Sequence, residues 1–92
     1  MMRVRGEIYS KRSYLDKTLQ KTMNILFIKA DESINFNGDL IKFIPIISEC
    51  SANFSVGEKI QLEGEISTEY IVTSLGKRSF EPVPVIRTRS IS

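Results

Sequence analysis

KIQLEGEIST, residues 59–68, decides the fold class of this 92-residue chain. Its apolar residues Ile60, Leu62 and Ile66 alternate with polar residues. Such alternation places the apolar side chains on one face of a β-strand, against a core, and the polar side chains on the other face. We therefore predict a strand over residues 59–68 and an all-β fold made of similar strands.

Four other stretches share this strand character. They are short, rich in β-branched residues, and separated by Gly, Asn and charged residues. No long stretch keeps the apolar period of 3.6 residues that indicates a helix. We predict the other four strands at residues 2–10, 21–31, 40–48 and 83–91.

The connections between the predicted strands are uneven in length. Those over residues 11–20 and 69–82, after the first and fourth strands, are long. Residues 32–39 predict a turn, because Asn37-Gly38 tolerates positive φ. The segment before the fourth strand is irregular, and we expect one short helical turn in it.

Five strands with long connections after the first and the fourth favour the OB-fold, a five-stranded Greek-key barrel. OB-folds bind oligonucleotides with the face of strands 2 and 3 and with loops L12 and L45, which follow strands 1 and 4. We predict a single OB-fold domain over residues 1–92. An SH3-like barrel is the alternative, although it does not favour long loops at those two places.

The composition excludes several classes of protein. Apolar residues make up 41% of the chain and charged residues 26%, as in ordinary globular proteins. The apolar stretches are too short to span a bilayer, and the first residues contain no apolar core of an export signal. Cys50 is the only cysteine and histidine is absent, which excludes an internal disulfide, zinc sites and His-based catalysis. We therefore expect a cytoplasmic protein without enzymatic activity, metal or cofactor.

Charge is distributed unevenly along the chain. Residues 1–30 carry seven Lys or Arg against two Asp or Glu, and residues 70–92 carry four against one. Residues 31–69 carry two against eight. A fold that joins the two ends of the chain would therefore have one basic face, which suits an anionic partner.

FIPII at residues 43–47, followed by FSVGEKIQLEGEIST at residues 54–68, resembles the third and fourth strands of the bacterial single-stranded DNA-binding protein family. MRVRGEI at residues 2–8 resembles the opening strand of that family, with its central Gly. In size the chain is similar to a short related group, primosomal replication protein B. The resemblance covers most of the chain. It implies an OB-fold that binds single-stranded DNA and forms a homo-oligomer of paired barrels.

The chain departs from that family in two respects. The family usually has a Trp near the end of the third strand, where this chain has Ser48-Glu49, and the chain has no Trp. The acidic tail that recruits repair and replication enzymes in the family is also missing from the sequence, which ends in RTRSIS. We expect the fold to follow the resemblance, and we do not expect recruitment through such a tail.

Two pentapeptides nearly repeat each other, SKRSY at residues 10–14 and GKRSF at residues 76–80. In an OB-fold they would lie in L12 and L45, which flank one binding groove. Basic grooves that follow the phosphates, together with rings on which bases stack, bind single strands. The predicted phosphate contacts and stacking rings here are Lys11, Arg12, Tyr14, Tyr70, Lys77, Arg78 and Phe80. The alternative is a pair of solvated loops whose rings cap the ends of the barrel.

The predicted strands 2 and 3 add two residues to this set. Lys29 and Lys42 can point into the groove, although single lysines on a strand also serve solubility alone. We assign three rings in or beside apolar strands to the core: Phe27, Phe43 and Phe54. Tyr9, at the end of the first predicted strand, stays undecided between a core position and a binding role.

These observations predict a small protein that binds single-stranded DNA and is accessory to DNA replication or a related DNA transaction. Other replication proteins are further partners under this hypothesis, and RNA stays open as an alternative ligand. The alternative function is an OB-fold assembly subunit that binds another protein and little nucleic acid. The missing Trp and the acidic middle of the chain favour that alternative.

Overall fold

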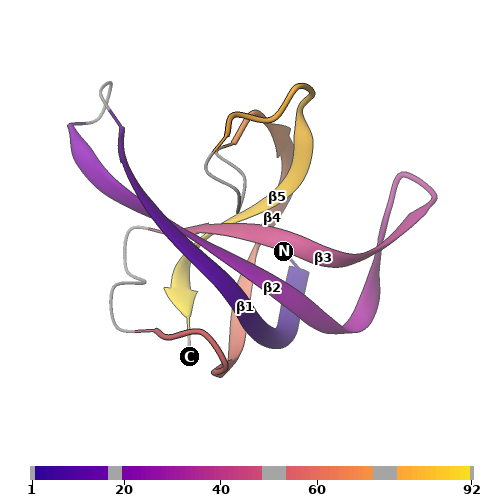
Figure 1. Ribbon diagram of the computed structural model, residues 1–92. Helices are drawn as coiled ribbons and strands as arrows, with labels where there is room; N and C mark the ends of the chain where they lie inside the picture. The colour runs from indigo at the N-terminus through magenta and orange to yellow at the C-terminus, as the bar shows by residue number, and fades with distance from the viewer. Residues whose placement is uncertain (1, 17–19, 49–53, 72–76, 92) are drawn as a thin grey trace.

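A computed structural model describes residues 2–16, 20–48, 54–71 and 77–91 of the chain (Figure 1). Five β-strands account for most of these residues: β1 (Met2–Asp16), β2 (Lys21–Phe36), β3 (Asp39–Ser48), β4 (Lys59–Glu69) and β5 (Val83–Ile91). In this described part, no helix is long and apolar enough to cross a membrane. The all-β class and the five strands predicted from the sequence are confirmed.

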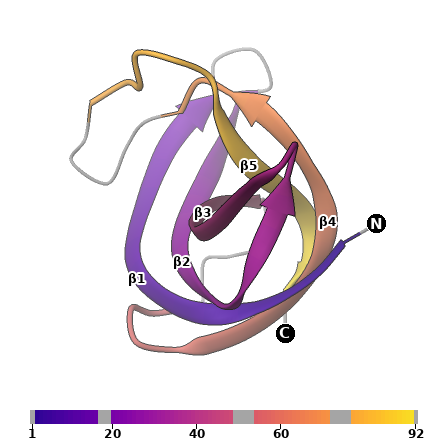
Figure 2. The same ribbon diagram turned by 90° about the vertical axis from the view of Figure 1, so that its right-hand side faces the viewer.

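The five strands form one mixed sheet that closes in a ring. Its order is β1-β2-β3-β5-β4, and β4 pairs again with β1. All pairings are antiparallel except that of β3 with β5, which is parallel. Figure 2 shows the ring from one end, and β1 curves from its pairing with β4 to its pairing with β2.

The first strand is longer than predicted. It was expected to end at Ser10, but β1 continues to Asp16 and pairs with β2 as far as Asp16↔Lys21. The polar sequence that suggested a loop is accommodated by polar pairing across the strands. The Ser13 hydroxyl donates a hydrogen bond of 2.6 Å to the Asn24 side-chain oxygen. SKRSY therefore lies in a strand, and the prediction of a long L12 loop that contains it was wrong.

The second strand is also longer than predicted, and it ends in a tight hairpin. Residues 32–36, expected in a turn, belong to β2, and Phe36 pairs with Asp39 across the two turn residues. Both turn residues have positive φ, 53° at Asn37 and 87° at Gly38, as the sequence predicted for Asn-Gly. In Figure 1 this hairpin projects from the rest of the sheet.

The segment before β4 differs in part from its prediction. The described residues 54–58 contain a turn at Val56-Gly57 and no helix. Residues 49–53, where the rest of the expected helical turn falls, lie outside the described residues.

Gly6 allows β1 to serve two neighbours. It pairs with Ala30 of β2 and with Ile60 of β4. A Cβ atom at this position would lie 2.5 Å from the backbone oxygen of Lys29, far inside contact distance. Only a residue without a side chain permits so close an approach of the two strands.

Two buried clusters lie on opposite faces of β2. Residues 23–28 of β2 are buried without interruption, so alternate side chains enter alternate clusters. The interior cluster consists of Val4, Ile8, Leu26, Ile28, Ala30, Ile34, Ile44, Ile46, Ile60, Leu62 and Ile86. The outer cluster consists of Met23, Ile25, Phe27, Ile47, Ile71 and Val85. Ile71, which follows β4, thus covers part of the outer face of β2 and β3.

Candidate nucleic-acid interface

An aromatic pair lies on the outer face of β1, β2 and β3. The rings of Tyr9 and Phe43 meet edge to face, with centroids 5.5 Å apart and planes at 85°. Both are substantially exposed, Tyr9 by 43% and Phe43 by 57%. Tyr9 also contacts the buried Phe27 ring, at a centroid distance of 6.3 Å. The pair is therefore a ring surface open to solvent and supported from beneath.

A β-bulge holds Tyr9 in this position. The β1–β2 register shifts between Ile8 and Ser10, so Tyr9 is the extra residue, and it follows the fully buried Ile8. The backbone around the bulge is fixed from the other side. Ile8 N–H donates to the Glu58 oxygen at 2.9 Å, and Gly57 N–H donates to the Ile8 oxygen at 2.8 Å. Bulges of this kind often redirect a side chain at a functional site.

The Tyr9 phenol is neutral at pH 7, and its environment strengthens this preference. Partial burial raises the pKa of its phenol above the ordinary value of 10.0, because desolvation disfavours the charged form. A neutral ring beside Phe43 places no negative charge on this surface at pH 7.

One lysine, Lys29, lies beside the aromatic pair, and a second, Lys42, lines a hollow together with it. The Lys29 ammonium is 6.0 Å from the centroid of the Phe43 ring, within the range of a cation–π contact. Lys29 and Lys42 line one hollow of about 270 Å³, together with Lys59 and the acids Glu7 and Asp31. Among the described residues, neither Lys29 nor Lys42 forms an ion pair.

One of the two acids that line this hollow, Asp31, is already engaged in an ion pair. Lys59 Nζ donates to Asp31 Oδ1 at 2.9 Å, and this hydrogen bond raises the pKa of Lys59. The ion pair neutralises Asp31, so the other charges that line the hollow are Lys29 and Lys42 against Glu7, which leaves a net positive charge for an anionic ligand.

A second group of rings and cations lies in the connection between β4 and β5. The Arg78 guanidinium is 5.1 Å from the centroid of the Tyr70 ring. Phe80 is fully exposed, and Lys77 is exposed beside Arg78. The connection is tied to itself, since Ser79 N–H donates to the Ile71 oxygen at 2.8 Å. This part of the predicted site lies outside the strands, as expected for L45.

The outer cluster links the two groups. Phe27 supports Tyr9 from below and belongs to the same buried cluster as Ile71. Ile71 directly follows Tyr70 and is bonded to Ser79. The aromatic pair and the β4–β5 connection are thus anchored in one apolar layer on the outer face.

The remaining predicted residues have a different environment. Lys11 Nζ donates a hydrogen bond of 2.8 Å to the backbone oxygen of Phe54, and Arg12 is half-buried in β1. The backbone of Tyr14 pairs with Met23, and its side chain lies outside the described part of the chain. The structure therefore groups Lys29 with Lys42, and Tyr70 with Arg78, but it places the first pentapeptide within the sheet.

The sequence interpretation did not identify the two exposed rings of the sheet face, Tyr9 and Phe43. Phe43 was assigned to the core and Tyr9 was left undecided. The structure confirms the core position of Phe27 and packs the partly buried Phe54 against the interior cluster, but it exposes Phe43. Alternation along β3 contains the signal, because Ile44 and Ile46 face the interior and the residue before Ile44 must then face outward.

No family model matches the chain, and no curated protein matches it. The described residues contain no group of three or more His, Cys, Asp or Glu side chains that could hold a metal ion.

Proposed function

We propose that the chain is an OB-fold protein that binds single-stranded DNA on the outer face of β1–β3. The ring order β1-β2-β3-β5-β4 and the parallel β3–β5 pair support the OB-fold. The sequence resemblance to bacterial single-stranded DNA-binding proteins supports the choice of ligand. The proposed role is accessory to DNA replication or a related DNA transaction, with other replication proteins and further copies of the chain as partners.

The exposed Tyr9–Phe43 pair beside Lys29 carries this proposal. Solvent-exposed rings on a sheet offer faces on which unpaired bases stack, and each stacked base contributes about 1–3 kcal/mol. Cations next to those rings add to the affinity by contacting the phosphates of the strand. Lys29 lies next to the Phe43 ring, and Lys42 lines the same hollow as Lys29. Duplex DNA, whose bases are already stacked, cannot use the rings in this way.

The β4–β5 connection extends the proposed interface. Arg78 and Lys77 would contact the backbone of the strand beyond the sheet face, and Phe80 and Tyr70 would stack on its bases. An OB-fold uses this loop, L45, together with the face of strands 2 and 3. The proposal thus keeps the second pentapeptide of the prediction and replaces the first by Tyr9 and Phe43.

Fluorescence anisotropy with labelled oligo-dT, oligo-rU and duplex DNA at two salt concentrations tests the proposal. We expect binding to oligo-dT, weaker binding to the duplex, and lower affinity at higher salt. Phe43→Ala is expected to weaken oligo-dT binding about 5- to 150-fold, the equivalent of about 1–3 kcal/mol. No binding of any oligonucleotide at low salt would overturn the proposal.

Leu40→Ala is the matched control for Phe43→Ala. Leu40 is another exposed apolar residue of β3, at 73% exposure, but it has no part in the aromatic pair. Its removal is expected to leave oligo-dT affinity within about twofold, as for a surface change of a few tenths of a kcal/mol. Equal losses in the two variants would show that apolar area, and not ring stacking, is responsible.

The exposed rings also favour a second candidate, the assembly subunit. Phe80 projects fully into solvent, and exposed aromatic residues are enriched where proteins bind proteins. Under this hypothesis the chain binds oligonucleotides weakly or not at all, and Phe80→Ala disrupts a protein complex. The anisotropy experiment above separates the two candidates.

A further inference from the structure

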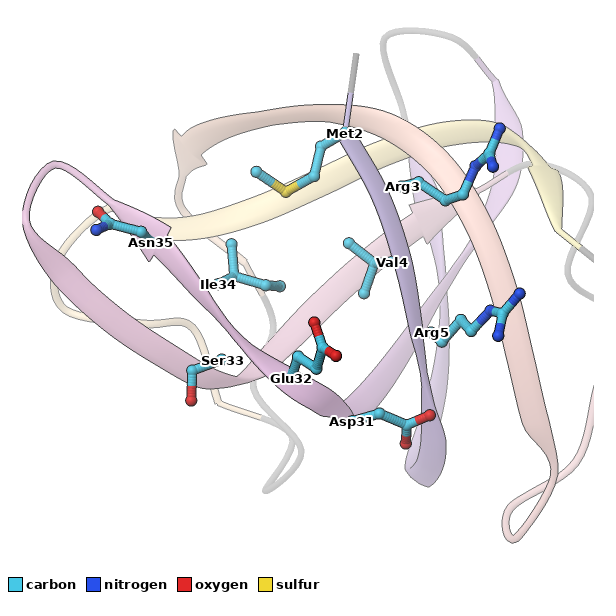
Figure 3. A pocket seen from close by; sticks show the side chains of 9 residues that line it. All are labelled: Met2, Arg3, Val4, Arg5, Asp31, Glu32, Ser33, Ile34 and Asn35. Carbon is cyan, nitrogen blue, oxygen red and sulfur yellow. The ribbon is translucent and has the colours of Figure 1, made fainter.

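A groove lies where β1 and β2 separate, at one end of the ring. The two strands pair from Gly6↔Ala30 onward, and residues 2–5 of β1 pair with β4 alone. The space between the diverging strands is a groove of about 530 Å³ (Figure 3), a size typical of ligand sites. It is distinct from the hollow beside Phe43, although Asp31 borders both.

The β1 edge of this groove presents backbone hydrogen-bonding groups. Ile8 N–H points toward β4, where it donates to the Glu58 oxygen. Backbone groups alternate in direction along a strand, so those of Arg3 and Arg5 point toward the groove. Among the described residues, no strand pairs with this edge. An extended peptide can add to such an edge as a further strand.

The floor of the groove is apolar. Val4 and Ile34 belong to the interior cluster, and Met2 packs against it. Figure 3 shows these three side chains directed into the space between the strands. A ligand that adds to the β1 edge would therefore bury apolar side chains against the interior cluster.

The charges at the groove favour a basic ligand. Arg3 pairs with Glu63 at 2.7 Å, and Arg5 Nε donates to Gln61 Oε1 at 2.9 Å. Both guanidinium groups lie on the far side of β1, away from the groove (Figure 3). Glu32 instead projects from β2 into the space between the strands (Figure 3).

Glu32 is thus the charge that a ligand in the groove would meet. It forms no ion pair with a described residue, whereas the neighbouring Asp31 pairs with Lys59. A negative charge at this point repels the phosphates of a nucleic acid and attracts Lys or Arg.

We propose that this groove binds an extended peptide segment of a partner protein, added as a strand to the edge of β1. On the face toward the groove, the segment carries apolar side chains for the floor and a Lys or Arg for Glu32. These side chains alternate with outward ones, because residues i and i+2 of a strand share a face. The chain would then bind a protein and a nucleic acid at different surfaces.

Acetyl-Val-Thr-Lys-Thr-Val-amide is the probe for this proposal, with the Lys→Glu peptide and a peptide N-methylated at both Thr as controls. Binding to the full chain is measured by calorimetry. We expect the Lys peptide to bind at least about fivefold more tightly than the Glu peptide, and the N-methylated peptide not to bind. Failure of the Lys peptide to bind, or equal binding of all three peptides, would overturn the proposal.

Substitution of Glu32 locates the peptide. Glu32→Gln is expected to lower the affinity for the Lys peptide about threefold. Glu32→Lys is expected to reverse the preference, so that the Glu peptide binds more tightly than the Lys peptide. Glu65→Gln, at an exposed carboxylate of β4 outside the groove, is the control and should leave both affinities unchanged. Unchanged preference in Glu32→Lys, with its fold verified by thermal melting, would contradict the proposal.

NMR and competition give a second measurement that does not depend on a variant. The largest amide shifts on addition of the Lys peptide are expected at Arg3, Arg5 and residues 31–34. Saturating oligo-dT should leave the peptide bound. Displacement by oligo-dT, shifts confined to the Tyr9–Phe43 face, or a groove filled by a second copy of the chain would overturn the proposal.

Discussion

Two stretches share Lys-Arg-Ser followed by an aromatic residue, yet they lie in different environments. Residues 11–14 belong to β1, where Lys11 bonds to the Phe54 oxygen and Ser13 to Asn24. Residues 77–80 belong to the connection between β4 and β5, where Arg78 lies over Tyr70 and Phe80 is fully exposed. The same four-residue pattern thus supports the sheet in one place and forms an open surface in the other.

The difference shows that the neighbours of a short basic-aromatic sequence determine its role. The first stretch runs beside residues 23–26 of β2, which are buried and need a partner strand to satisfy their backbone groups. Within the described part of the chain, the second pairs with none of the five strands and is tied to residues 70 and 71 through Ser79 and Arg78. Substitutions in the first stretch should therefore affect stability, and those in the second should affect binding.

Lys11→Met is expected to have the largest effect on stability, and so to separate the two stretches most clearly. The change removes a charged donor from the Phe54 oxygen in a partly buried place. We expect the free energy of unfolding to fall by about 1–2 kcal/mol, measured by urea denaturation. Lys77→Met is the control at the matching position of the second stretch and should stay within about 0.5 kcal/mol of the original chain. Equal changes in the two variants would contradict the structural role of Lys11.

Phe80→Ala is expected to have the opposite effects, with a loss of affinity for oligo-dT and no loss of stability. It removes a fully exposed ring, so the free energy of unfolding should not fall. Affinity for oligo-dT should decrease about 5- to 30-fold, as for the loss of one stacking ring worth about 1–2 kcal/mol. Ser13→Ala provides the comparison, since it deprives the buried Asn24 of a donor and should lower stability without a change in affinity. An unchanged affinity in Phe80→Ala would exclude this ring from the interface.

Arg78→Gln should change the salt dependence of binding. If Arg78 contacts one phosphate, its loss reduces the slope of log affinity against log salt by about 0.7, with a loss of affinity of a few fold at low salt. Oligo-dT titrations at four or more salt concentrations give the slope. Lys11→Met, whose ammonium bonds to Phe54, should leave the slope as it is. A reduced slope in Lys11→Met and an unchanged one in Arg78→Gln would reverse our assignment of the two stretches.

The strand pattern could be predicted from the sequence where apolar residues alternate or crowd. KIQLEGEIST and VPVIRTRSI gave strands with nearly the observed bounds, and Asn37-Gly38 gave the hairpin turn. The extension of β1 through SKRSYLD could not be predicted in this way. Its stabilisation comes from pairing with β2, and from contacts such as Lys11 with Phe54 that join residues far apart in the sequence.

The candidate site was predictable to a lesser degree. Lys29 and Lys42 could be chosen because basic residues on strands 2 and 3 of an OB-fold face a groove. The outward position of Tyr9 depends on a bulge, and the bulge depends on the bonds of Ile8 with Gly57 and Glu58. No local pattern in the sequence encodes a register shift of this kind. The outward position of Phe43, in contrast, follows from simple alternation along β3.

The smallest expected effect concerns the base of the β4–β5 connection, which carries the second stretch. Arg87 donates two hydrogen bonds of 2.6 Å to the Glu69 carboxylate, and this bonding holds the pKa of Glu69 below its ordinary value of 4.5. A carboxyl with a lowered folded-state pKa stabilises the fold above its unfolded pKa, and the contribution is lost as pH falls through the folded-state pKa. Because the pair is partly exposed and screened by solvent, the contribution should amount to a few tenths of a kcal/mol.

Urea denaturation between pH 3 and pH 7 measures this contribution. Glu69→Gln is expected to lose a little stability at pH 7 and to match the original chain at the acid end of the range. Glu65→Gln, four residues earlier on β4 at an exposed carboxylate that forms no ion pair with a described residue, should reproduce the pH profile of the original chain. If both variants changed the pH profile alike, the net charge of β4, and not the ion pair of Glu69 with Arg87, would be responsible for the pH dependence of stability. If only Glu69→Gln does so, and oligo-dT affinity falls with it, then the ion pair positions the connection that presents Arg78 and Phe80.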